Sequence, residues 1–553
     1  MKYSGAEITI KLLERQGITT IAGIPGGANL PLYHALSGSS INHILSRHEQ
    51  GAGFIAQGIA RSTGKTAVCF ATSGPGVVNL LTAIADAKLD SIPVVAITGQ
   101  VASSLIGTDA FQEIDTYGLS LPITKHNFLV RSAEELLTVI PEAFRIAGSG
   151  RPGPVVVDIP KDVQNEQIEI SEWPSPAMPA AVDPVDVNAI RTAAQMINDA
   201  QRPLLYIGGG VIASEASSLL REIVHEYNIP VVSTLNGLGT IADDDPLYFG
   251  MLGMHGARAA NELVDSCDLL IALGVRFDDR ATGKISEFAP DAAIVHIDID
   301  KSEFNKIKKV HCSVRGNVAE ALSLLKNLMV KQQRSGWDDA VKAGRSKLVA
   351  ARTKDKNALH PSNVIRFVSS IVPDSAIITT DVGQHQMWVA QHYPFKQPRT
   401  LLTSGGLGTM GFGLPNAIGA ALAHPDRMVI CFSGDGSILM NIQELATVAD
   451  HELNVTVLLF NNGHLGLVRQ QQELFYNKRF MASKFIRNPE FAEIAAGFGI
   501  KSITISDPSG VGKEIPELLL QKGPAFINII IPHEYNVLPM VPPGAANRDT
   551  IGD

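Results

Sequence analysis

The clearest evidence for the fold class is the segment MVICFSGDGSILMNIQELATVADHELNVTVLLFNN, residues 428–462. It opens with an apolar run, Met428–Ser433, and the glycine turn GDG follows at once. Apolar residues then recur at helical spacing up to Ala449, and a second apolar run, Val455–Phe460, ends in two asparagines. Short apolar runs of this kind are typical of buried parallel strands. The pattern predicts strand, glycine turn, helix and strand of an α/β fold.

An acid and an amide follow these two predicted strands. Asp435 lies in the GDG turn, Asn462 closes the NN pair, and 24 residues separate the two motifs. Carboxyl ends of adjacent parallel strands meet at one sheet edge, where ligands gather. Glycines let a backbone approach a ligand, a helix N-terminus favours phosphate, and carboxylate and amide oxygens suit Mg²⁺. We expect a diphosphate–metal site here; the alternative is an ordinary turn and a strand-end loop.

The same alternation continues on both sides of this stretch. Apolar runs at 67–71, 94–98 and 155–159 end in the loops TSGPG, TGQ and IPKD. Two composition breaks, the Pro-rich 172–187 and the polar 331–361, predict linkers. The fold class we expect is α/β, with three doubly wound parallel-sheet domains at 1–170, 187–335 and 360–530. The Pro-rich end, 531–553, fits a mobile lid or a plain disordered tail.

Composition excludes several classes of protein. Of 553 residues, 45% are hydrophobic and 18% charged, which is ample for buried cores and excludes a disordered chain. A net charge of −9 without basic blocks argues against nucleic acid or an anionic membrane as partner. The four scattered cysteines indicate a reducing compartment. With no signal-like start and no apolar run near the ~20 residues of a membrane span, we expect a cytoplasmic protein.

The GDG…NN pattern resembles the signature of thiamine-diphosphate enzymes, and further segments narrow the resemblance to the acetolactate synthase (acetohydroxyacid synthase) catalytic subunits. These segments cover nearly the whole length: RHEQGAGFIAQGIAR (47–61), TSGPGVVNL (72–80), IGTDAFQE (106–113), SGRPGPVVVDIPKDVQ (149–164), GVRFDDRATGK (274–284), GGLGTMGFGLP (405–415) and PMVPPGAA (539–546).

The resemblance implies an activity, cofactors and partners. The expected reaction is decarboxylation of pyruvate on thiamine diphosphate and transfer of the hydroxyethyl unit to a second pyruvate or to 2-oxobutanoate, the first common step of branched-chain amino-acid biosynthesis. The three domains would bind the pyrimidine, FAD and the diphosphate with Mg²⁺, in that order. The family implies a homodimer or dimer of dimers, with each active site between the first domain of one chain and the third of the other, and a small regulatory subunit.

Glu49, in RHEQG, is the expected catalytic carboxyl, because the cofactor needs such a group beside a nitrogen of its aminopyrimidine. Without the family context, a helix-start Glu paired with Arg47 or His48 is the plainer interpretation. One relative, glyoxylate carboligase, lacks this glutamate. The remaining thiamine-diphosphate positions carried over from the family are Val382, Gly383, Gln384, His385, Gly408, Met410, Gly434, Asp435, Gly436, Ser437, Asn462 and His464, and Asp435, Asn462 and the His464 backbone carbonyl would bind the metal.

Other family positions are expected to contact substrate. Gly27 and Ala28 would lie near the reacting carbon, Gln112 would hydrogen-bond bound intermediates, and Lys161 in IPKD is a further catalytic candidate. Arg280, at the end of RFDDR, is expected to hold the carboxylate of the second keto acid, since a planar guanidinium suits that group. A salt bridge to Asp278 or Asp279 is its alternative.

For the central domain, the resemblance alone implies FAD. The run Gly208–Gly210 follows an apolar stretch, but it does not match the G-x-G-x-x-G fingerprint. The positions implied for the flavin, whose role in the family is structural, are Arg151, His255, Arg276, His296, Asp298 and Arg315.

One departure from the family concerns substrate choice. Many members carry Trp where this chain has Gln471, and the family links that Trp to preference for 2-oxobutanoate. We therefore expect weak preference here. Two rival functions stay open from sequence: a sibling enzyme such as a pyruvate oxidase, and a non-catalytic protein that keeps the fold.

Overall fold

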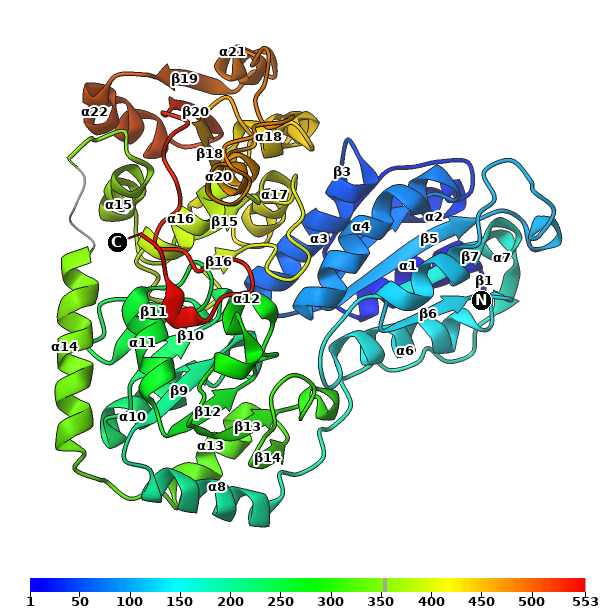
Figure 1. Cartoon of the computed structure of the whole chain (residues 1–553). Coiled ribbons are helices and arrows are strands. Elements are labelled where there is room, and N and C mark those ends of the chain that lie inside the picture. Colours follow the sequence, from blue (N-terminus) through cyan, green and yellow to red (C-terminus); the bar gives the residue numbers. More distant parts are fainter. Residues whose placement is uncertain (352–355, 553) are drawn as a thin grey trace.

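Three parallel six-stranded sheets, one after another along the chain, form the framework of the molecule (Figure 1). The structure is a computed structural model that describes residues 1–351 and 356–552. Helices cover the sheets, so the predicted fold class, three α/β domains, is confirmed. No helix within these residues is both long enough and apolar enough to pass through a lipid bilayer.

The first sheet has the strand order β3-β2-β4-β5-β7-β6, and all its pairs are parallel. Its strands are β2 (Thr20–Gly23), β3 (Asn42–Leu45), β4 (Ala67–Ala71), β5 (Val94–Gln100), β6 (His126–Leu129) and β7 (Val155–Pro160). The helices of this domain are α1 (Gly5–Arg15), α2 (Leu30–Leu36), α3 (Glu49–Thr63), α4 (Pro75–Asp90), α5 (Thr116–Ser120), α6 (Leu136–Gly148) and α7 (Lys161–Asn165). A small antiparallel pair, β1 (Lys2–Ser4) with β8 (Gln167–Glu169), ties its ends together.

The third sheet repeats this topology with the order β16-β15-β17-β18-β20-β19. Its strands are β15 (Ile377–Thr380), β16 (Leu401–Leu402), β17 (Val429–Gly434), β18 (Val455–Asn461), β19 (Lys501–Ile505) and β20 (Ala525–Ile530). Its helices are α15 (Pro361–Ile371), α16 (Gln384–His392), α17 (Gly413–Ala423), α18 (Asp435–Ile438), α19 (Leu445–Asp450), α20 (Gly466–Phe475), α21 (Phe491–Gly497) and α22 (Pro508–Leu519). Counted within each domain, both sheets run 2-1-3-4-6-5, so the first and third domains share one fold.

The central sheet has a different order, β11-β10-β9-β12-β13-β14. Counted within the domain it runs 3-2-1-4-5-6, the order of dinucleotide-binding folds, with its switch point between β9 and β12. The strands are β9 (Pro203–Ile207), β10 (Val231–Ser233), β11 (Tyr248–Met251), β12 (Leu269–Leu273), β13 (Ala293–Asp298) and β14 (Cys312–Arg315). The helices are α8 (Val187–Asp199), α9 (Gly209–Ala213), α10 (Ser217–Tyr227), α11 (Arg258–Ser266), α12 (Asp279–Thr282) and α13 (Val318–Lys326).

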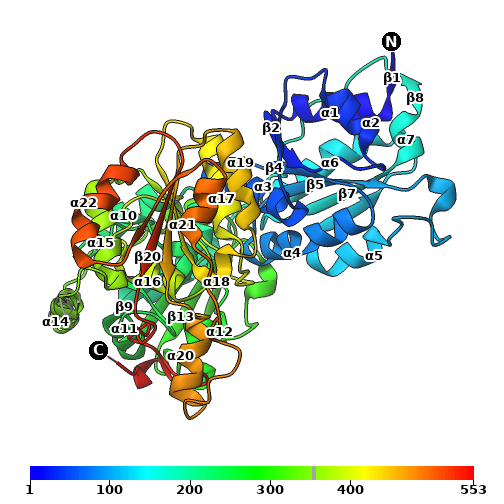
Figure 2. The same cartoon turned by 90° about the horizontal axis from the view of Figure 1, so that it is seen from above.

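Helix α3 of the first domain packs on helix α17 of the third, as Figure 2 shows from above. The two helices occupy equivalent places in the two sheets, after the second strand and before the third. Glycines bring their backbones together: a Cβ on Gly58 would lie 2.2 Å from the Asn416 carbonyl, and one on Gly419 would lie 2.0 Å from that of Ile55. The contact fixes the third domain against the first.

The helix predicted after GDG differs from the structure. It is divided into α18, a 3₁₀ turn at 442–444 and α19. Asn441 lies at the break with non-helical backbone angles, and its side-chain amide donates to the Gly411 carbonyl at 2.8 Å and to Gln50 at 3.0 Å. These tertiary hydrogen bonds replace the helical ones.

The second predicted linker and the tail also contain structure. Helix α14 (Ser335–Ala351) occupies part of 331–361, while 352–355 lie outside the described residues. Between 531 and 552 the tail folds back over the other domains: the Val541 amide donates to the Met254 carbonyl at 2.7 Å, and Gln470 exchanges hydrogen bonds with the Val537 backbone. In Figure 1 the red tail runs between the central and third domains.

Candidate active site

The carboxyl edge of the third sheet brings Asp435 and the NN motif together. Strands β17 and β18 pair in parallel with Gly434 opposite Phe460, so the residues that follow each strand are neighbours. The Asp435 carboxylate accepts a hydrogen bond from the Gly463 amide at 2.7 Å. An acid, an amide and a bent backbone therefore meet at one point.

Asp435 is a buried carboxyl group, and among the described residues no salt bridge joins it to a basic side chain. It is 2% exposed, and burial raises its pKa, while hydrogen bonds from Asn488 and from the Gly463 and Gly436 amides oppose that rise. A bound divalent ion would stabilise such a carboxylate, and the donor set at this edge consists of oxygens, as Mg²⁺ prefers. Among residues 1–351 and 356–552, no cluster of three His, Cys, Asp or Glu side chains is arranged to hold a metal.

Asn462 and His464 complete the predicted metal set. The Asn462 amide donates to Gln384 at 3.2 Å, and its Oδ1 accepts from the His464 amide at 3.0 Å. The His464 ring is engaged elsewhere: it hydrogen-bonds the Asn462 carbonyl and stacks on His533 with 4.6 Å between ring centroids. This geometry leaves the backbone carbonyl, and not the ring, as the group available at position 464.

Two residues that the sequence analysis missed organise this edge. Asn488 donates to Asp435 at 2.8 Å and to Asn461 at 2.7 Å. Asp381 accepts from the Val382 amide at 2.9 Å, the Gly411 amide at 2.8 Å and the Ser433 hydroxyl, and burial raises its pKa to about 6. Asp381 follows β15, so its place at a strand's carboxyl end was a usable signal. Asn488 carries no comparable motif.

His385 lines the same edge beneath two glycines. Burial lowers its pKa to about 3, so the ring is neutral, and its Nε2 has no hydrogen-bond partner among the described residues. A Cβ on Gly434 would lie 2.8 Å from the ring, and one on Gly383 would lie 2.7 Å from it. A buried ring nitrogen that lacks a partner among the described residues, next to two glycines without side chains, fits a binding site for a polar ligand. Beside these glycines, the Ser437 hydroxyl oxygen accepts a hydrogen bond from the Gly434 amide at 3.2 Å.

Glu49 lies at the carboxyl edge of the first sheet, in the first turn of α3. It accepts a hydrogen bond from Asn79 at 3.0 Å, and a Cβ on Gly76 would lie 3.4 Å from its carboxylate. Among the described residues, Glu49 forms no ion pair with Arg47 or His48, which was the alternative interpretation. Arg47 pairs with Asp450 instead, and the His48 ring accepts a hydrogen bond from the Gln50 amide. Glu49 therefore faces the TSGPG loop.

Glu444 of the third domain holds the start of this helix, and sequence reasoning did not find it. Its buried carboxylate accepts from the backbone amides of Arg47 at 2.8 Å and His48 at 3.1 Å. A Cβ on Gly51 would lie 2.4 Å from the same carboxylate. The backbone that presents Glu49 is thus fixed by a second domain.

The other first-domain candidates lie at the same sheet edge. Gly27 is exposed, with open space where a Cβ would lie, and Lys161 is exposed at the start of α7. Gln112 has φ +60° and packs against Gly74, where a Cβ would lie 2.8 Å from the Gln112 carbonyl. Ala28 is buried next to Gly99. These residues surround an open edge of the sheet.

Arg280 lies on α12 of the central domain. Its side chain is 65% exposed, and its pair with Asp279 is long, 3.8 Å between Nε and Oδ2. Asp278 instead caps α12 by accepting from the Ala281 amide. Exposed ion pairs of this kind contribute about 0–1 kcal/mol, so the guanidinium is free to bind a carboxylate.

The residues implied for FAD are only partly grouped. Turns after β9 and β12 touch, since a Cβ on Gly208 would lie 2.4 Å from the Gly274 carbonyl. His255 and His296 are buried, and their Nδ1 atoms have no hydrogen-bond partner among residues 1–351 and 356–552. Burial lowers the pKa of His255 to about 4, and Asp298 ends β13 beside His296. The remaining three are arginines: Arg151 pairs with Glu303 and Asp300, Arg276 is half-buried after β12, and Arg315 is exposed and pairs with Asp183.

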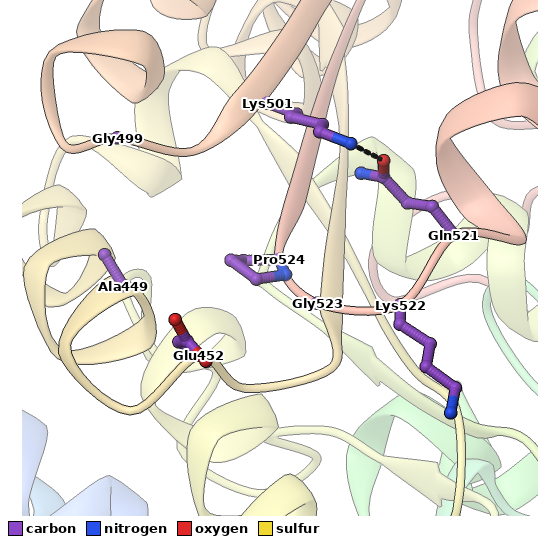
Figure 3. Close-up of a pocket in the computed structure, with 8 residues that line it drawn as sticks. All are labelled: Ala449, Glu452, Gly499, Lys501, Gln521, Lys522, Gly523 and Pro524. Atoms are coloured by element: carbon purple, nitrogen blue, oxygen red, sulfur yellow. Dashed lines mark hydrogen bonds between the residues drawn. The ribbon is translucent and has the colours of Figure 1, made fainter.

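A surface hollow elsewhere in the third domain is unrelated to this chemistry. It measures about 460 Å³ and is lined by Ala449, Glu452, Gly499, Lys501, Gln521, Lys522, Gly523 and Pro524 (Figure 3). Lys501 begins β19 and Pro524 precedes β20, so the hollow lies at the amino edge of the sheet. Ligands of parallel α/β sheets bind at the opposite edge.

Comparisons with known proteins agree with this arrangement. Three sequence models of thiamine pyrophosphate enzymes match the chain: the N-terminal TPP binding domain over residues 3–119, the central domain over 190–325 and the C-terminal TPP binding domain over 381–529. The fold and the paired sheet edges therefore define a thiamine pyrophosphate enzyme.

Relatives that match over the full length of the chain identify which thiamine pyrophosphate enzymes it resembles. The chain is 53% identical over 553 residues to the acetolactate synthase isozyme 1 large subunit of Escherichia coli K12, covering all of this chain and 98% of that protein. It is 46% identical to the isozyme 2 large subunit of the same organism, with 99% of each chain covered. It is 44% identical to the chloroplastic acetolactate synthase of Arabidopsis thaliana, with 99% of this chain and 84% of that protein covered.

The chain belongs to the acetolactate synthase large-subunit family. It is an enzyme of that class, a thiamine-diphosphate-dependent carboligase, and this reading is favoured over a sibling such as a pyruvate oxidase.

Proposed function

We propose that the chain decarboxylates pyruvate and joins the two-carbon unit to a second 2-keto acid, pyruvate or 2-oxobutanoate, at a site built from both sheet edges. The observation that carries the proposal is the buried Asp435 carboxyl group, which accepts from Gly463, has Asn462 beside it and forms no salt bridge within the part of the chain that the structure describes. In this proposal Asp435, Asn462 and the His464 carbonyl hold Mg²⁺. The domains at 1–170 and 360–530 bind the pyrimidine and the diphosphate, respectively.

Thiamine diphosphate, when bound, supplies the carbanion stabilisation that decarboxylation needs. The chain orients it and controls protons. The Glu49 carboxyl would hydrogen-bond a nitrogen of the pyrimidine ring, and Asn79 holds that carboxyl by a hydrogen bond of 3.0 Å. Val382, Gly383, Gln384, His385 and Gly408 would line the cofactor with backbone and neutral groups. Gly434, Gly436 and Ser437 would lie under its diphosphate, and the bulky apolar Met410 would pack against it.

The second keto acid binds through its carboxylate. Arg280 is the proposed anchor because its guanidinium is exposed and weakly paired. Gln112, in the loop after β5, would donate a hydrogen bond to the bound intermediate. Lys161 and Gly27 border the space at the carboxyl edge of the first sheet. Closure of the tail, 531–553, over this space is a further part of the proposal, supported by its contacts with α20 and Met254.

FAD is proposed for the central domain, 187–335. The strand order 3-2-1-4-5-6 supports a dinucleotide at the β9–β12 switch point. The Nδ1 atoms of His255 and His296, which have no partner in the described part of the chain, fit a polar ligand there. Arg276 and Asp298 follow β12 and end β13, respectively, while Arg151 and Arg315 would need to leave their present ion pairs to reach it.

A homodimer, or a dimer of dimers, is proposed because each half of the site is open. Among the described residues, no hydrogen bond or ion pair joins Glu49 to Asp435, Asn462 or His464. Apolar side chains beside both edges are exposed: Phe111 next to Gln112 is 88% exposed, and Met440 beside Gly411 is 53% exposed. A second chain would cover them and bring the two halves together. A small regulatory subunit and a cytoplasmic location are also proposed.

The test separates the two proposed roles. Asp435→Asn should weaken Mg²⁺-dependent binding of thiamine diphosphate at least tenfold in a calorimetric titration. Glu49→Gln should keep that binding within about threefold and lower kcat by 10²–10⁴-fold, the usual range for lost acid–base catalysis. Glu134→Gln, on the surface of the first domain, is the control. Wild-type turnover in Glu49→Gln would contradict the proposal.

A further inference from the structure

The loop 404–409, which we call the junction loop, joins β16 to α17 and ends next to Met410. Its middle, 405–408, is exposed, but Ser404 at its base is buried. The Ser404 hydroxyl oxygen accepts from the backbone amides of Gly408 and Thr409, each at 3.0 Å. One side chain therefore sets the backbone of the residues proposed to line the cofactor.

Asp86, from helix α4 of the first domain, holds that side chain. The Ser404 hydroxyl donates to Asp86 Oδ2, and the Thr409 hydroxyl donates to the same oxygen at 3.1 Å. The other carboxylate oxygen accepts from Arg61 at 3.0 Å. Asp86 is fully buried, so these donors replace the water that a carboxylate otherwise needs.

Arg61, on α3, contacts the chain on both sides of the junction loop. Its Nη1 donates to the Thr403 carbonyl at 2.9 Å, and its guanidinium lies 4.9 Å from the centre of the Phe412 ring. The side chain is 7% exposed. Arg61 of the first domain thus contacts the third domain on both sides of the junction loop.

Asp90 extends the junction to the central domain. It accepts from Arg61 at 2.9 Å, from the Gly405 amide at 2.9 Å and from Asn236 at 3.2 Å. A Cβ on Gly406 would lie 2.8 Å from Leu89, so the loop lies flat on the end of α4. Three domains meet at a single loop.

The charges explain why the loop is fixed before any ligand arrives. One guanidinium, that of Arg61, faces the two carboxyl groups of Asp86 and Asp90. Burial raises the pKa of Asp86, and the hydroxyls of Ser404 and Thr409 oppose that rise. Because a buried carboxylate without donors is costly, the loop conformation that supplies those donors is favoured.

We infer that Asp86, acting through the Ser404 hydroxyl, is a positioning residue that sets the backbone of Gly408 and Thr409, and hence of Met410, before thiamine diphosphate binds. This inference rests on the proposed function for its consequence, since Gly408 and Met410 line the cofactor only in that proposal. The loop geometry itself does not depend on it.

The first experiment uses the full-length protein without cofactors. Amide hydrogen exchange should be about tenfold faster at Gly408 and Thr409 in Ser404→Ala than in the wild type. Asp86→Asn should change it in the same direction, and Ser404→Thr should restore slow exchange. Ser62→Ala is the matched control, because that buried hydroxyl on α3 bonds the Gly58 carbonyl and does not touch the loop. Equal exchange in Ser404→Ala and Ser62→Ala would overturn the inference.

The second experiment measures the dissociation constant of thiamine diphosphate in the presence of Mg²⁺. Ser404→Ala should raise it about tenfold, with the thermal midpoint of the apoprotein matching that of Ser62→Ala. If Asp435→Asn weakens binding and Ser404→Ala does not, the inference is wrong. If neither weakens it, the proposed cofactor site is wrong instead. Ser404→Ala leaves the charges intact, so it decides the question if Asp86→Asn does not fold.

Discussion

Asp158 is a buried carboxyl at the carboxyl end of β7, and it ties the loop that carries Gln112 to the sheet. Its oxygens accept from the Thr98 hydroxyl at 2.6 Å and from Gln100 at 3.0 Å, and Gln100 also donates to the Ile114 carbonyl at 2.9 Å. Burial raises the pKa of Asp158 from 3.8 to about 7. The folded state therefore favours the protonated acid.

A pH dependence follows from that shift. Since the folded pKa lies above the unfolded one, the folded state binds the extra proton between about pH 4 and pH 7. The stabilisation is present below pH 4 and is lost as pH rises through about 7. It amounts to at most about 4 kcal/mol. Asp158→Asn should gain thermal stability relative to the wild type from pH 5 to pH 8, whereas the exposed Asp291→Asn should not. A pH-independent difference would contradict the assignment.

Gln471, on α20, is expected to set substrate preference. It is half-buried, while its neighbour Gln470 is buried and bonded to Val537 and Gln384. A flexible polar side chain at 471 discriminates weakly between an ethyl and a methyl group, whereas one methylene in a fitted apolar pocket is worth about 1–3 kcal/mol. Gln471→Trp should raise the ratio of aceto-hydroxybutanoate to acetolactate at least fivefold in a mixed-substrate assay. Gln472→Trp is the control, and a strong 2-oxobutanoate bias in the wild type would contradict the expectation.

Single site residues could be predicted from the sequence only where they form part of a motif. Asp435 and Asn462 were predicted as neighbours because both follow apolar runs of one local unit. Glu444 and Asn488 were missed because each is a single polar residue whose partner is set by tertiary packing. The Asp86–Ser404 contact joins residues 318 positions apart, which no local pattern can indicate.

Among the elements, the crossing of α3 and α17 depends on two glycines. A Cβ on Gly419 would lie 2.0 Å from the Ile55 carbonyl, so the helices must separate or the backbone must bend. Gly419→Ala should therefore destabilise the protein by about 1–3 kcal/mol, the usual cost of overpacking. Gly336→Ala, on α14 with open space around it, should be neutral or stabilising by up to about 1 kcal/mol. Equal thermal midpoints for the two variants would show that α3 and α17 are not tightly packed where they cross.

Strands were predicted more accurately than helices. The runs at 67–71 and 455–460 form β4 and β18, because buried parallel strands are apolar on both faces. The helix after GDG is interrupted at Asn441, whose hydrogen bonds to Gly411 and Gln50 are tertiary. The polar composition of 331–361 predicted a linker, yet α14 forms there and buries Trp337 and Val341 on the central domain.

For the whole molecule, the proposal of a site shared between two chains makes a specific prediction. Glu49→Gln and Asp435→Asn should each inactivate the protein. When the two chains are co-expressed with different tags and purified by both, one of the two sites in each mixed dimer combines two unaltered halves. The mixed dimer should therefore recover about half of wild-type activity, whereas two differently tagged Glu49→Gln chains should recover none. A site within one chain would give no recovery in either mixture.

Domain order and fold class were predicted from alternation and composition breaks, because those properties follow from local periodicity. The shared 2-1-3-4-6-5 order of the first and third sheets was not, since strand order depends on crossovers between distant segments. The same is true of the central sheet, whose order favours a dinucleotide although its GGG turn lacks the usual fingerprint.

A carboligase releases one carbon dioxide for each acetolactate that it forms, so product stoichiometry is the first measurement to make on this chain. The purified protein is supplied with thiamine diphosphate, Mg²⁺, FAD and pyruvate, and carbon dioxide and acetolactate are followed together. We expect one acetolactate for each carbon dioxide released. Carbon dioxide accompanied by acetate or acetaldehyde, without acetolactate, would contradict it.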